Sequence, residues 1–217
     1  MDWRLNDTVI IPVQNSFVYG ELEIPLHAQS VVIFSHGSGS SRLSPRNQFV
    51  ARYLHQQNIG TLLFDLLTEK EDLNYQNRFD ITLLTKRLIR ATEWLVEQPV
   101  ARQLSLGYFG ASTGAASAIR AASLLPNIQA VVSRGGRPDL AGTVYLIKLE
   151  APSLLIVGSL DTEVIRLNEW AAAQIKGKNK LEIVPGATHL FEEAGTMDKV
   201  CELAAAWFRH YLIPVEA

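Results

Sequence analysis

The chain has 217 residues, of which 47% are hydrophobic and 19% are charged, and its formal net charge is −2 at pH 7. This length suits one domain with a sizeable core, so we expect a single domain over residues 1–217. The small net charge gives no electrostatic reason to expect binding to nucleic acid or to an anionic membrane. The one cysteine, Cys201, excludes an internal disulfide and a multi-cysteine metal site, and we expect no metal and no cofactor.

The start of the chain carries no targeting signal. Residues 1–4 lack the basic start and apolar core of a signal peptide, and no apolar run approaches the length of a membrane span. We therefore expect a cytoplasmic protein whose partner is a small molecule, with no nucleic-acid or membrane partner. The sequence leaves homodimerisation open.

Apolar runs separated by turn residues predict an alternating series of strands and helices. In chain order, strands are expected at 9–13, 17–22, 31–34, 61–64, 104–109, 130–132, 153–157 and 180–184. Helices are expected around Phe49, Val50, Tyr53 and Leu54, at 80–98, 115–120 and 164–175, and around Val200, Leu203, Ala204, Trp207 and Tyr211. An antiparallel strand pair followed by alternating strands and helices favours a mostly parallel sheet with helices on both faces.

The most informative motif is Gly-Ala-Ser-Thr-Gly at 110–114, between the strand at 104–109 and the helix at 115–120. A G-x-S-x-G sequence between a strand and a helix is the context of a nucleophile elbow. The glycines flank the serine because the turn is too tight for side chains, and the strained backbone lifts the hydroxyl clear of the sheet. The motif therefore predicts Ser112 as a nucleophile.

A serine hydroxyl needs a base near neutral pH, and the base needs an acid that orients it. Asp161 follows the strand at 153–157 and His189 follows the strand at 180–184, so an acid and a histidine both come after the serine, each on a loop after a later strand. Asp161 also stands where a residue would cap the next helix, and Glu163 is a nearby substitute acid. We expect Asp161 and His189 to complete a catalytic triad.

An oxyanion hole needs two backbone N–H donors beside the nucleophile. One is expected from Thr113, and the other from Ser38 in the glycine-rich loop that follows the strand at 31–34. The glycines of this loop let the backbone approach a ligand, so Gly37 is expected to contact the substrate. His36 is expected to order the loop beneath the hole.

The same loop supports a second interpretation. Gly37 and Gly39 after one strand, with Asp65 after the next, imitate the opening of a dinucleotide-binding fold. Arg42 stands at the third glycine position, and the helix does not begin directly at the glycines. We therefore expect Asp65 to order the loop.

With these residues in hand, the chain resembles the α/β-hydrolase superfamily, and within it the small dienelactone hydrolase-like branch. The resemblance covers about residues 16–212 and rests on 36–39, 110–114, 133–140, 160–161 and 188–189. It implies a three-layer α/β/α sandwich with a mostly parallel, eight-stranded sheet. It also implies a serine hydrolase that forms an acyl-enzyme on Ser112. Dienelactone hydrolases proper carry a cysteine nucleophile, so the dienelactone substrate is not carried over.

Only about twenty residues separate the strands at 128–132 and 153–157, so a large cap domain is not expected. A shallow pocket favours carboxylic esters with small or short acyl chains. Arg134 and Arg137 are candidates for recognising a substrate carboxylate, or alternatively for structural bonds to nearby carbonyls and Asp139. Two other functions stay open, an acyltransferase with the same triad and a non-catalytic small-molecule-binding protein on a hydrolase fold.

Overall fold

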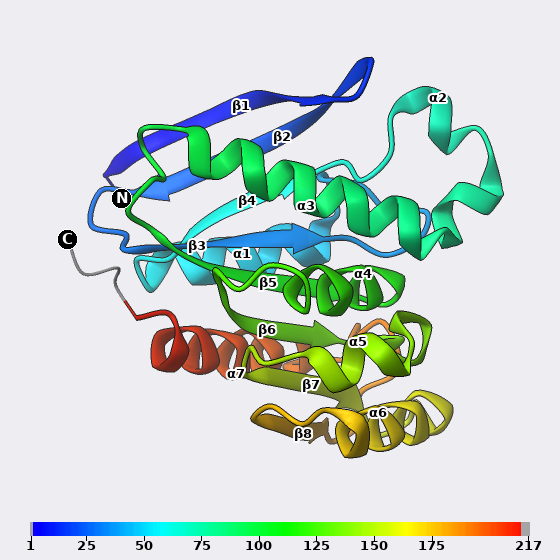
Figure 1. The fold of residues 1–217 in the computed structure, drawn as a ribbon. Coiled ribbons are helices and arrows are strands. Elements are labelled where there is room, and N and C mark those ends of the chain that lie inside the picture. Colours follow the sequence, from blue (N-terminus) through cyan, green and yellow to red (C-terminus); the bar gives the residue numbers. More distant parts are fainter. Residues whose placement is uncertain (1, 214–217) are drawn as a thin grey trace.

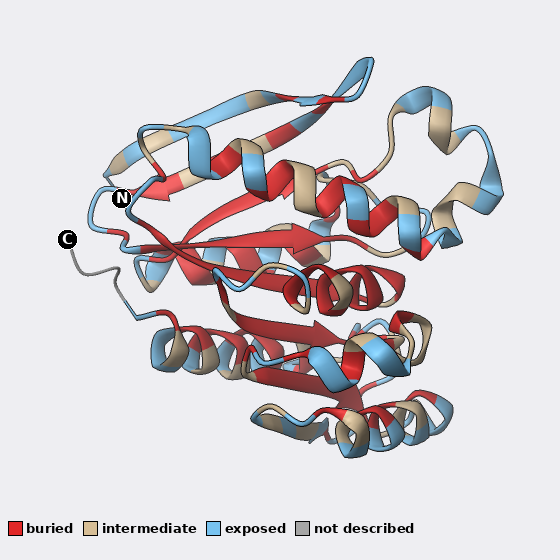
Figure 2. Cartoon of the chain, in the orientation of Figure 1, coloured by how far each residue is buried: buried red, intermediate tan, exposed pale blue. Residues whose placement is uncertain are grey.

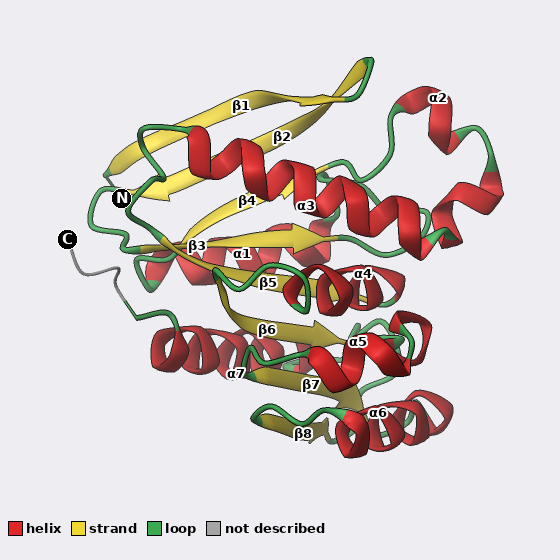
Figure 3. Ribbon diagram, viewed as in Figure 1, coloured by secondary structure: helices red, strands yellow, loops and turns green. Residues whose placement is uncertain are grey.

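Eight strands form one sheet in the computed structural model, which describes residues 2–213 (Figures 1 and 3). They are β1 (Trp3–Val13), β2 (Ser16–Pro25), β3 (Ser30–Ser35), β4 (Gly60–Phe64), β5 (Ser105–Ala111), β6 (Ile128–Arg134), β7 (Ser153–Gly158) and β8 (Asn179–Val184). Their order across the sheet is β1-β2-β4-β3-β5-β6-β7-β8. The pairs β1–β2 and β2–β4 are antiparallel, and every other pair is parallel. The predicted mostly parallel, eight-stranded sheet is confirmed.

Helices cover both faces of this sheet. They are α1 (Pro45–Gln56), α2 (Glu69–Asp72), α3 (Ile81–Glu97), α4 (Thr113–Ala122), α5 (Thr143–Lys148), α6 (Thr162–Gln174) and α7 (Thr196–Tyr211), with 3₁₀ turns η1 (Tyr75–Phe79) and η2 (Pro138–Ala141). Helices α3, α4, α5 and α6 lie on one face of the sheet, and α1 and α7 lie on the other (Figure 1). Buried side chains of each set of helices join the core of the face that they cover. This arrangement is a three-layer sandwich. Within residues 2–213, no helix is both long and apolar enough to cross a bilayer.

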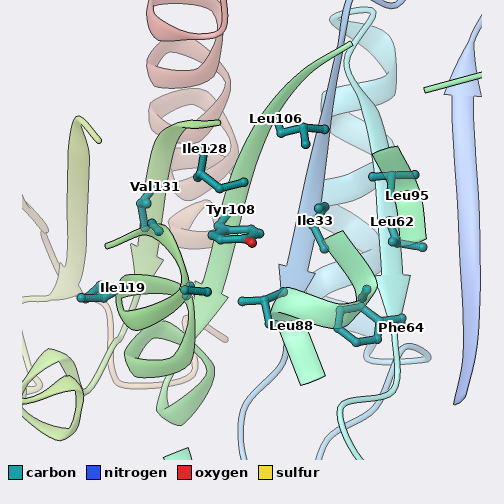
Figure 4. Close-up of a cluster of buried hydrophobic side chains, with 14 of the residues drawn as sticks. Ile33, Leu62, Phe64, Leu88, Leu95, Leu106, Tyr108, Ile119, Ile128 and Val131 are labelled. Atoms are coloured by element: carbon teal, nitrogen blue, oxygen red, sulfur yellow. The ribbon is translucent and has the colours of Figure 1, made fainter. Parts of the chain in front are cut away.

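The central parallel strands are buried on both sides, as the red strands of Figure 2 show. Leu84, Leu88, Ala91 and Leu95 recur at helical spacing along α3 and bring one face of that helix into the core. Figure 4 shows Leu88 and Leu95 beside side chains of β3, β4 and β5, including Tyr108. The hydroxyl of Tyr108 bonds the Thr92 hydroxyl of α3 at 2.7 Å, so the one polar atom of this large side chain is satisfied inside the core.

Some element boundaries differ from the predicted ones. Strand β1 begins at Trp3, six residues before the predicted start, because its first half is paired with β2 although most of its side chains are half-buried or exposed. Helix α2 was not predicted; it is short and begins with a capping box between Thr68 and Glu71. Helix α5 and the turn η2 were also not predicted, and they alone fill the segment between β6 and β7. That segment contains no large cap, as expected.

Candidate active site

Ser112 occupies the sharp turn between β5 and α4 with φ 51° and ψ −121°, a conformation that costs energy for a residue with a side chain. Its backbone is held on one side by the last residue of β6 and on the other by the segment that follows β6. The N–H of Ser112 donates to the carbonyl of Arg134 at 3.2 Å, and the N–H of Arg137 donates to the carbonyl of Ser112 at 3.1 Å. The strained conformation is therefore supported by hydrogen bonds from the neighbouring strand β6 and from the loop after it.

The two glycines of the motif are needed because backbone segments pass too close for a side chain. A Cβ at Gly110 would lie 2.5 Å from the Cα of Ala115. A Cβ at Gly114 would overlap the carbonyl oxygens of Ser35 and His36, where the end of β3 packs against the start of α4. The elbow thus depends on close contact between β3, β5 and α4.

The structure pairs His189 with Asp161. The imidazole Nδ1 lies 2.6 Å from the Asp161 Oδ2. Asp161 precedes α6 at its N-cap position, yet its side chain makes no capping bond, so the interpretation of Asp161 as a helix cap alone is wrong. Since the carboxylate can only accept, Nδ1 is the donor of this bond, and Nε2 is the ring nitrogen left to interact with a substrate or with Ser112. Glu163, the alternative acid, lies within the first turn of α6.

Ser112 and His189 line one cavity of about 250 Å³ at the carboxyl ends of the parallel strands. The lining residues are Gly37, Ser38, Ser40, Ser44, Arg46, Asn47, Ala111, Ser112, Arg134, His189 and Leu190. None of them is an aspartate or a glutamate. The predicted site residues Gly37, Ser38 and Arg134 thus line the same cavity as Ser112 and His189.

The loop after β3 lies directly against the elbow. A Cβ at Gly37 would lie 3.2 Å from the Cβ of Ser112, so this position has little room for a side chain. The N–H of Ser38 donates to the Thr113 Oγ1 at 2.9 Å. Ser38 and Thr113, the two residues predicted for the oxyanion hole, are therefore adjacent, and the Ser38 N–H points toward the residue that follows Ser112.

His36 and Asp65 hold this loop in place. The His36 Nδ1 donates to the carbonyl of Gly37 at 2.9 Å, and its Nε2 accepts from the N–H of Leu66 at 3.0 Å. Burial lowers the pKa of His36, consistent with a neutral ring. Asp65 accepts from the Arg42 N–H at 2.9 Å and from its Nη1 at 2.6 Å. Its carboxylate is thus engaged within the loop, as expected for a loop-ordering residue.

The two candidate arginines of the 133–140 segment behave differently. The Arg137 guanidinium forms a two-bond pair with Asp139, at 2.9 and 2.8 Å, and does not line the cavity. Arg134 does line the cavity and is only 7% exposed. Burial lowers the pKa of Arg134 to about 10, and the nearby charge of Arg46 contributes to the shift.

Three supporting features were not singled out in the sequence. Asn168 of α6 donates to the carbonyl of Gly136 at 3.0 Å and so anchors the segment that holds the elbow. Glu193 accepts from both the N–H and the hydroxyl of Thr188, which orders the loop that carries His189. Arg46 and Asn47 reach the cavity from the first turn of α1, a position marked in the sequence only by the Ser44 N-cap and Pro45.

No group of three or more His, Cys, Asp or Glu side chains within residues 2–213 is arranged to hold a metal ion. Cys201 is buried on α7, and burial raises the pKa of its thiol to about 12. A buried thiol of this kind is neutral at pH 7 and does not serve as the nucleophile.

No family model matches the chain. A protein of Mycobacterium tuberculosis named as a "putative phosphoribosyl transferase" is 54% identical over 196 residues, which is 90% of this chain and 44% of that protein. The chain therefore spans less than half the length of this relative. The esterase Est1E of Butyrivibrio proteoclasticus has the same fold, with a TM-score of 0.80 at 15% identity over 94% of this chain and 98% of the other.

A crystal structure of a dienelactone hydrolase from Anabaena variabilis is much more similar to this chain than Est1E is. It aligns with a TM-score of 0.93 and 49% identity, over 96% of this chain and 99% of the other. Identity at this level over almost the whole of both chains reflects common descent as well as a common fold. The chain belongs to the dienelactone hydrolase family of α/β-hydrolases.

Proposed function

We propose that this protein is a serine hydrolase that cleaves carboxylic esters through an acyl-enzyme on Ser112. The observation that carries the proposal is the 2.6 Å pair between His189 and Asp161, which fixes the orientation of the imidazole. His189 and Ser112, which stands on the strained elbow, line the same cavity. A nucleophile, a base and an acid that orients the base are the three groups that acyl transfer through serine requires. The membership in a hydrolase family supports the same chemistry.

In the proposed reaction, the Ser112 hydroxyl attacks the ester carbonyl while its proton moves to the Nε2 of His189. Asp161 stabilises the resulting imidazolium and keeps the ring oriented. The ester C–O bond then breaks, and the leaving alkoxide takes the proton from His189. Water, deprotonated by the same nitrogen, attacks the acyl carbon; the bond from that carbon to the Ser112 oxygen breaks, the serine oxygen takes the proton back from His189, and the acid is released.

The oxyanion formed at the carbonyl would accept from the N–H groups of Thr113 and Ser38. In the free protein the Ser38 N–H donates to the Thr113 hydroxyl, so we expect the substrate oxygen to compete for that N–H. The hydroxyl of Thr113 thus keeps the loop close to the elbow before substrate binds. Donors positioned in advance lower the cost of reorganisation in the transition state.

The substrate is expected to be small or to carry a short acyl chain. The cavity is about 250 Å³, and the segment between β6 and β7 contributes only η2 and α5, with no cap to enclose a long chain. The transferase name belongs to relatives more than twice as long as the matched region, so we base the proposal on the geometry of the site.

The test is labelling by a fluorophosphonate, in which the serine oxygen bonds phosphorus and fluoride leaves, together with turnover of p-nitrophenyl acetate. We expect Ser112→Ala to lose labelling and His189→Ala and Asp161→Asn to lower turnover by about 10³–10⁴-fold. Ser123→Ala, at the other end of α4, is the matched serine control. A folded wild-type protein that neither labels nor turns over any ester would overturn the proposal and favour a non-catalytic binding protein.

A further inference from the structure

The four residues from Arg134 to Arg137, which we call the bridge, contact both the serine and the histidine of the site. The carbonyl of Arg134 accepts from the Ser112 N–H at 3.2 Å, and the N–H of Arg137 donates to the Ser112 carbonyl at 3.1 Å. Between them, a Cβ at Gly135 would lie 3.1 Å from the His189 carbonyl oxygen and 3.5 Å from its Nδ1 and Cε1. The bridge thus bonds Ser112 at its two ends and packs against His189 in its middle.

The bridge has little freedom to move. Gly135 has a left-handed φ of 51°, and its N–H donates to the Ile156 carbonyl of β7 at 2.8 Å. A Cβ at Gly136 would overlap the Ser133 Oγ and would lie 2.6 Å from the Ala115 Cβ of α4. Because the bridge is packed so closely, a shift of its backbone would be passed to the serine and to the histidine.

One buried amide fixes the bridge to α6. The Asn168 Nδ2 donates to the Gly136 carbonyl at 3.0 Å, and to the Val164 carbonyl one turn earlier in the helix at 2.8 Å. Asn168 is fully buried, and its Oδ1 has no hydrogen-bond partner within residues 2–213. A buried acceptor without a partner lowers stability. The amide is therefore better explained by where it holds the bridge than by what it adds to the stability of the fold.

The same helix begins at the acid that orients the histidine. Asp161 directly precedes α6, and its Oδ2 lies 2.6 Å from the His189 Nδ1. Asn168 comes seven residues later, which is two helical turns, so the two side chains stand on the same side of the helix about 10 Å apart along its axis. One helix therefore holds the histidine through Asp161, and the serine through Asn168 and the bridge.

We propose that Asn168 is a positioning residue, which acts through the bridge to set how Ser112 meets the Nε2 of His189. Asn168 does not line the cavity, so it acts without touching the substrate. Reacting groups must be held close to their productive geometry, and a misplacement of about 1 Å can cost about 100-fold in rate. The kinetic consequence rests on the proposed esterase activity, whereas the positioning rests on the contacts of the bridge.

The kinetic test is Asn168→Leu, in which the new side chain fills a similar volume but cannot donate a hydrogen bond. We expect kcat for p-nitrophenyl acetate to fall by about 10- to 100-fold, with KM nearly unchanged because the lining of the cavity is kept. Asn168→Gln keeps the amide donor and should recover part of the lost kcat.

Asn179→Leu is the matched control for this test. The Asn179 Nδ2 also donates to two backbone carbonyls, those of Ile175 and Gly177, both at 3.2 Å. Asn179 is the first residue of β8, so it lies at the amino end of the parallel strands, opposite the cavity. The control should keep kcat within about twofold of the wild type.

A second variant tests the histidine side of the bridge. Gly135→Ala would place a methyl group against the His189 ring, and we expect kcat to fall by about tenfold or more. Gly195→Ala is the matched control, because Gly195 also has a left-handed φ, 77°, but no described residue other than its chain neighbours lies within 4 Å of the added methyl. Both substitutions strain the backbone in the same way, so only Gly135→Ala should lower kcat.

A spectroscopic measurement separates this proposal from the esterase proposal. The His189 Nδ1 proton, held in a short charge-assisted bond, gives a far-downfield proton resonance that is assigned by its loss in His189→Gln. Asn168→Leu and Gly135→Ala should shift this resonance, and the two control variants should leave it unchanged. If the wild type cleaves no ester but the resonance responds in this way, the positioning proposal stands and the esterase proposal fails.

Two results would overturn the positioning proposal. One is a wild type that cleaves esters together with folded Asn168→Leu and Gly135→Ala variants whose kcat stays within about twofold of their controls. The other is a His189 resonance that neither variant moves. If Asn168→Leu does not fold, Asn168→Gln and Gly135→Ala decide the matter by the same two measurements.

Discussion

Two sets of residues near the cavity differ in whether their polar groups have hydrogen-bond partners. The first, which we call the oxyanion loop, is residues 36–42 after β3, where His36 and Arg42 both have partners and Asp65 holds Arg42 with two bonds. The second, which we call the arginine corner, consists of Arg46, Asn47 and Arg134, each with a buried polar atom that has no partner within residues 2–213. Groups that are already bonded define a shape, whereas buried groups without partners favour a ligand that would satisfy them.

The largest expected effect comes from a substitution at Gly114, where the end of β3 and the oxyanion loop pack against the elbow. Gly114→Ala would place a methyl group on the carbonyl oxygens of Ser35 and His36, both backbone atoms that cannot move alone. We expect the free energy of unfolding to fall by more than about 4 kcal/mol, or folding to fail. Urea denaturation measures this change in the free energy of unfolding.

Ala118→Gly, in the middle of the same helix, is the control and should cost about 1 kcal/mol from helix propensity alone, plus the small loss of one buried methyl group. If Gly114→Ala were as stable as this control and still active, the close packing of β3 on α4 would not be what makes the glycine necessary.

A second prediction concerns the arginine corner alone. Replacing a buried, unpaired charge with an apolar side chain of similar length removes its desolvation cost. We therefore expect Arg134→Met to raise the free energy of unfolding of the ligand-free protein by about 1–3 kcal/mol. Denaturant titration without added anions provides the measurement.

The comparison for that variant is Arg137→Met, which removes the partner of Asp139 and should be neutral or destabilising by up to about 1 kcal/mol. Loss of stability in Arg134→Met beyond that of Arg137→Met would mean that Arg134 serves the fold rather than a ligand.

The smallest expected effect is on the oxyanion loop. Asp65→Asn removes the charge that holds Arg42 but keeps the shape of the side chain, and both groups are partly exposed. We expect the free energy of unfolding to fall by about 1 kcal/mol. Turnover of p-nitrophenyl acetate should fall several-fold, because the Ser38 N–H lies on the loosened loop.

Asp139→Asn breaks a similar carboxylate–arginine pair outside the cavity and should change stability by a comparable amount with little effect on turnover. Equal losses of turnover in the two variants would show that the pair at Asp65 has no special link to the site.

Much of this site could be predicted because its signals are local. The elbow depends on five consecutive residues whose glycines are required by a single tight turn, and Asp161 and His189 each follow a recognisable apolar strand. The parallel sheet then follows from the alternation of strands and helices, and it brings the carboxyl ends of these strands to one edge. The short connections of α2, η1 and α5 could not be placed in this way, because a few residues give no periodicity to detect.

The amino-acid sequence alone was therefore enough to predict the α/β fold, and to propose Ser112 as the nucleophile together with the histidine and the acid. It could not separate Arg134 from Arg137, which stand three residues apart in the same polar segment, and it gave no sign that Arg46 and Asn47 face the same cavity. Those distinctions depend on which side chain finds a carboxylate partner, as Arg137 does in Asp139, and on how α1 packs against β4 and α7. Burial and pairing arise between segments far apart in the chain, so they are properties of the folded protein.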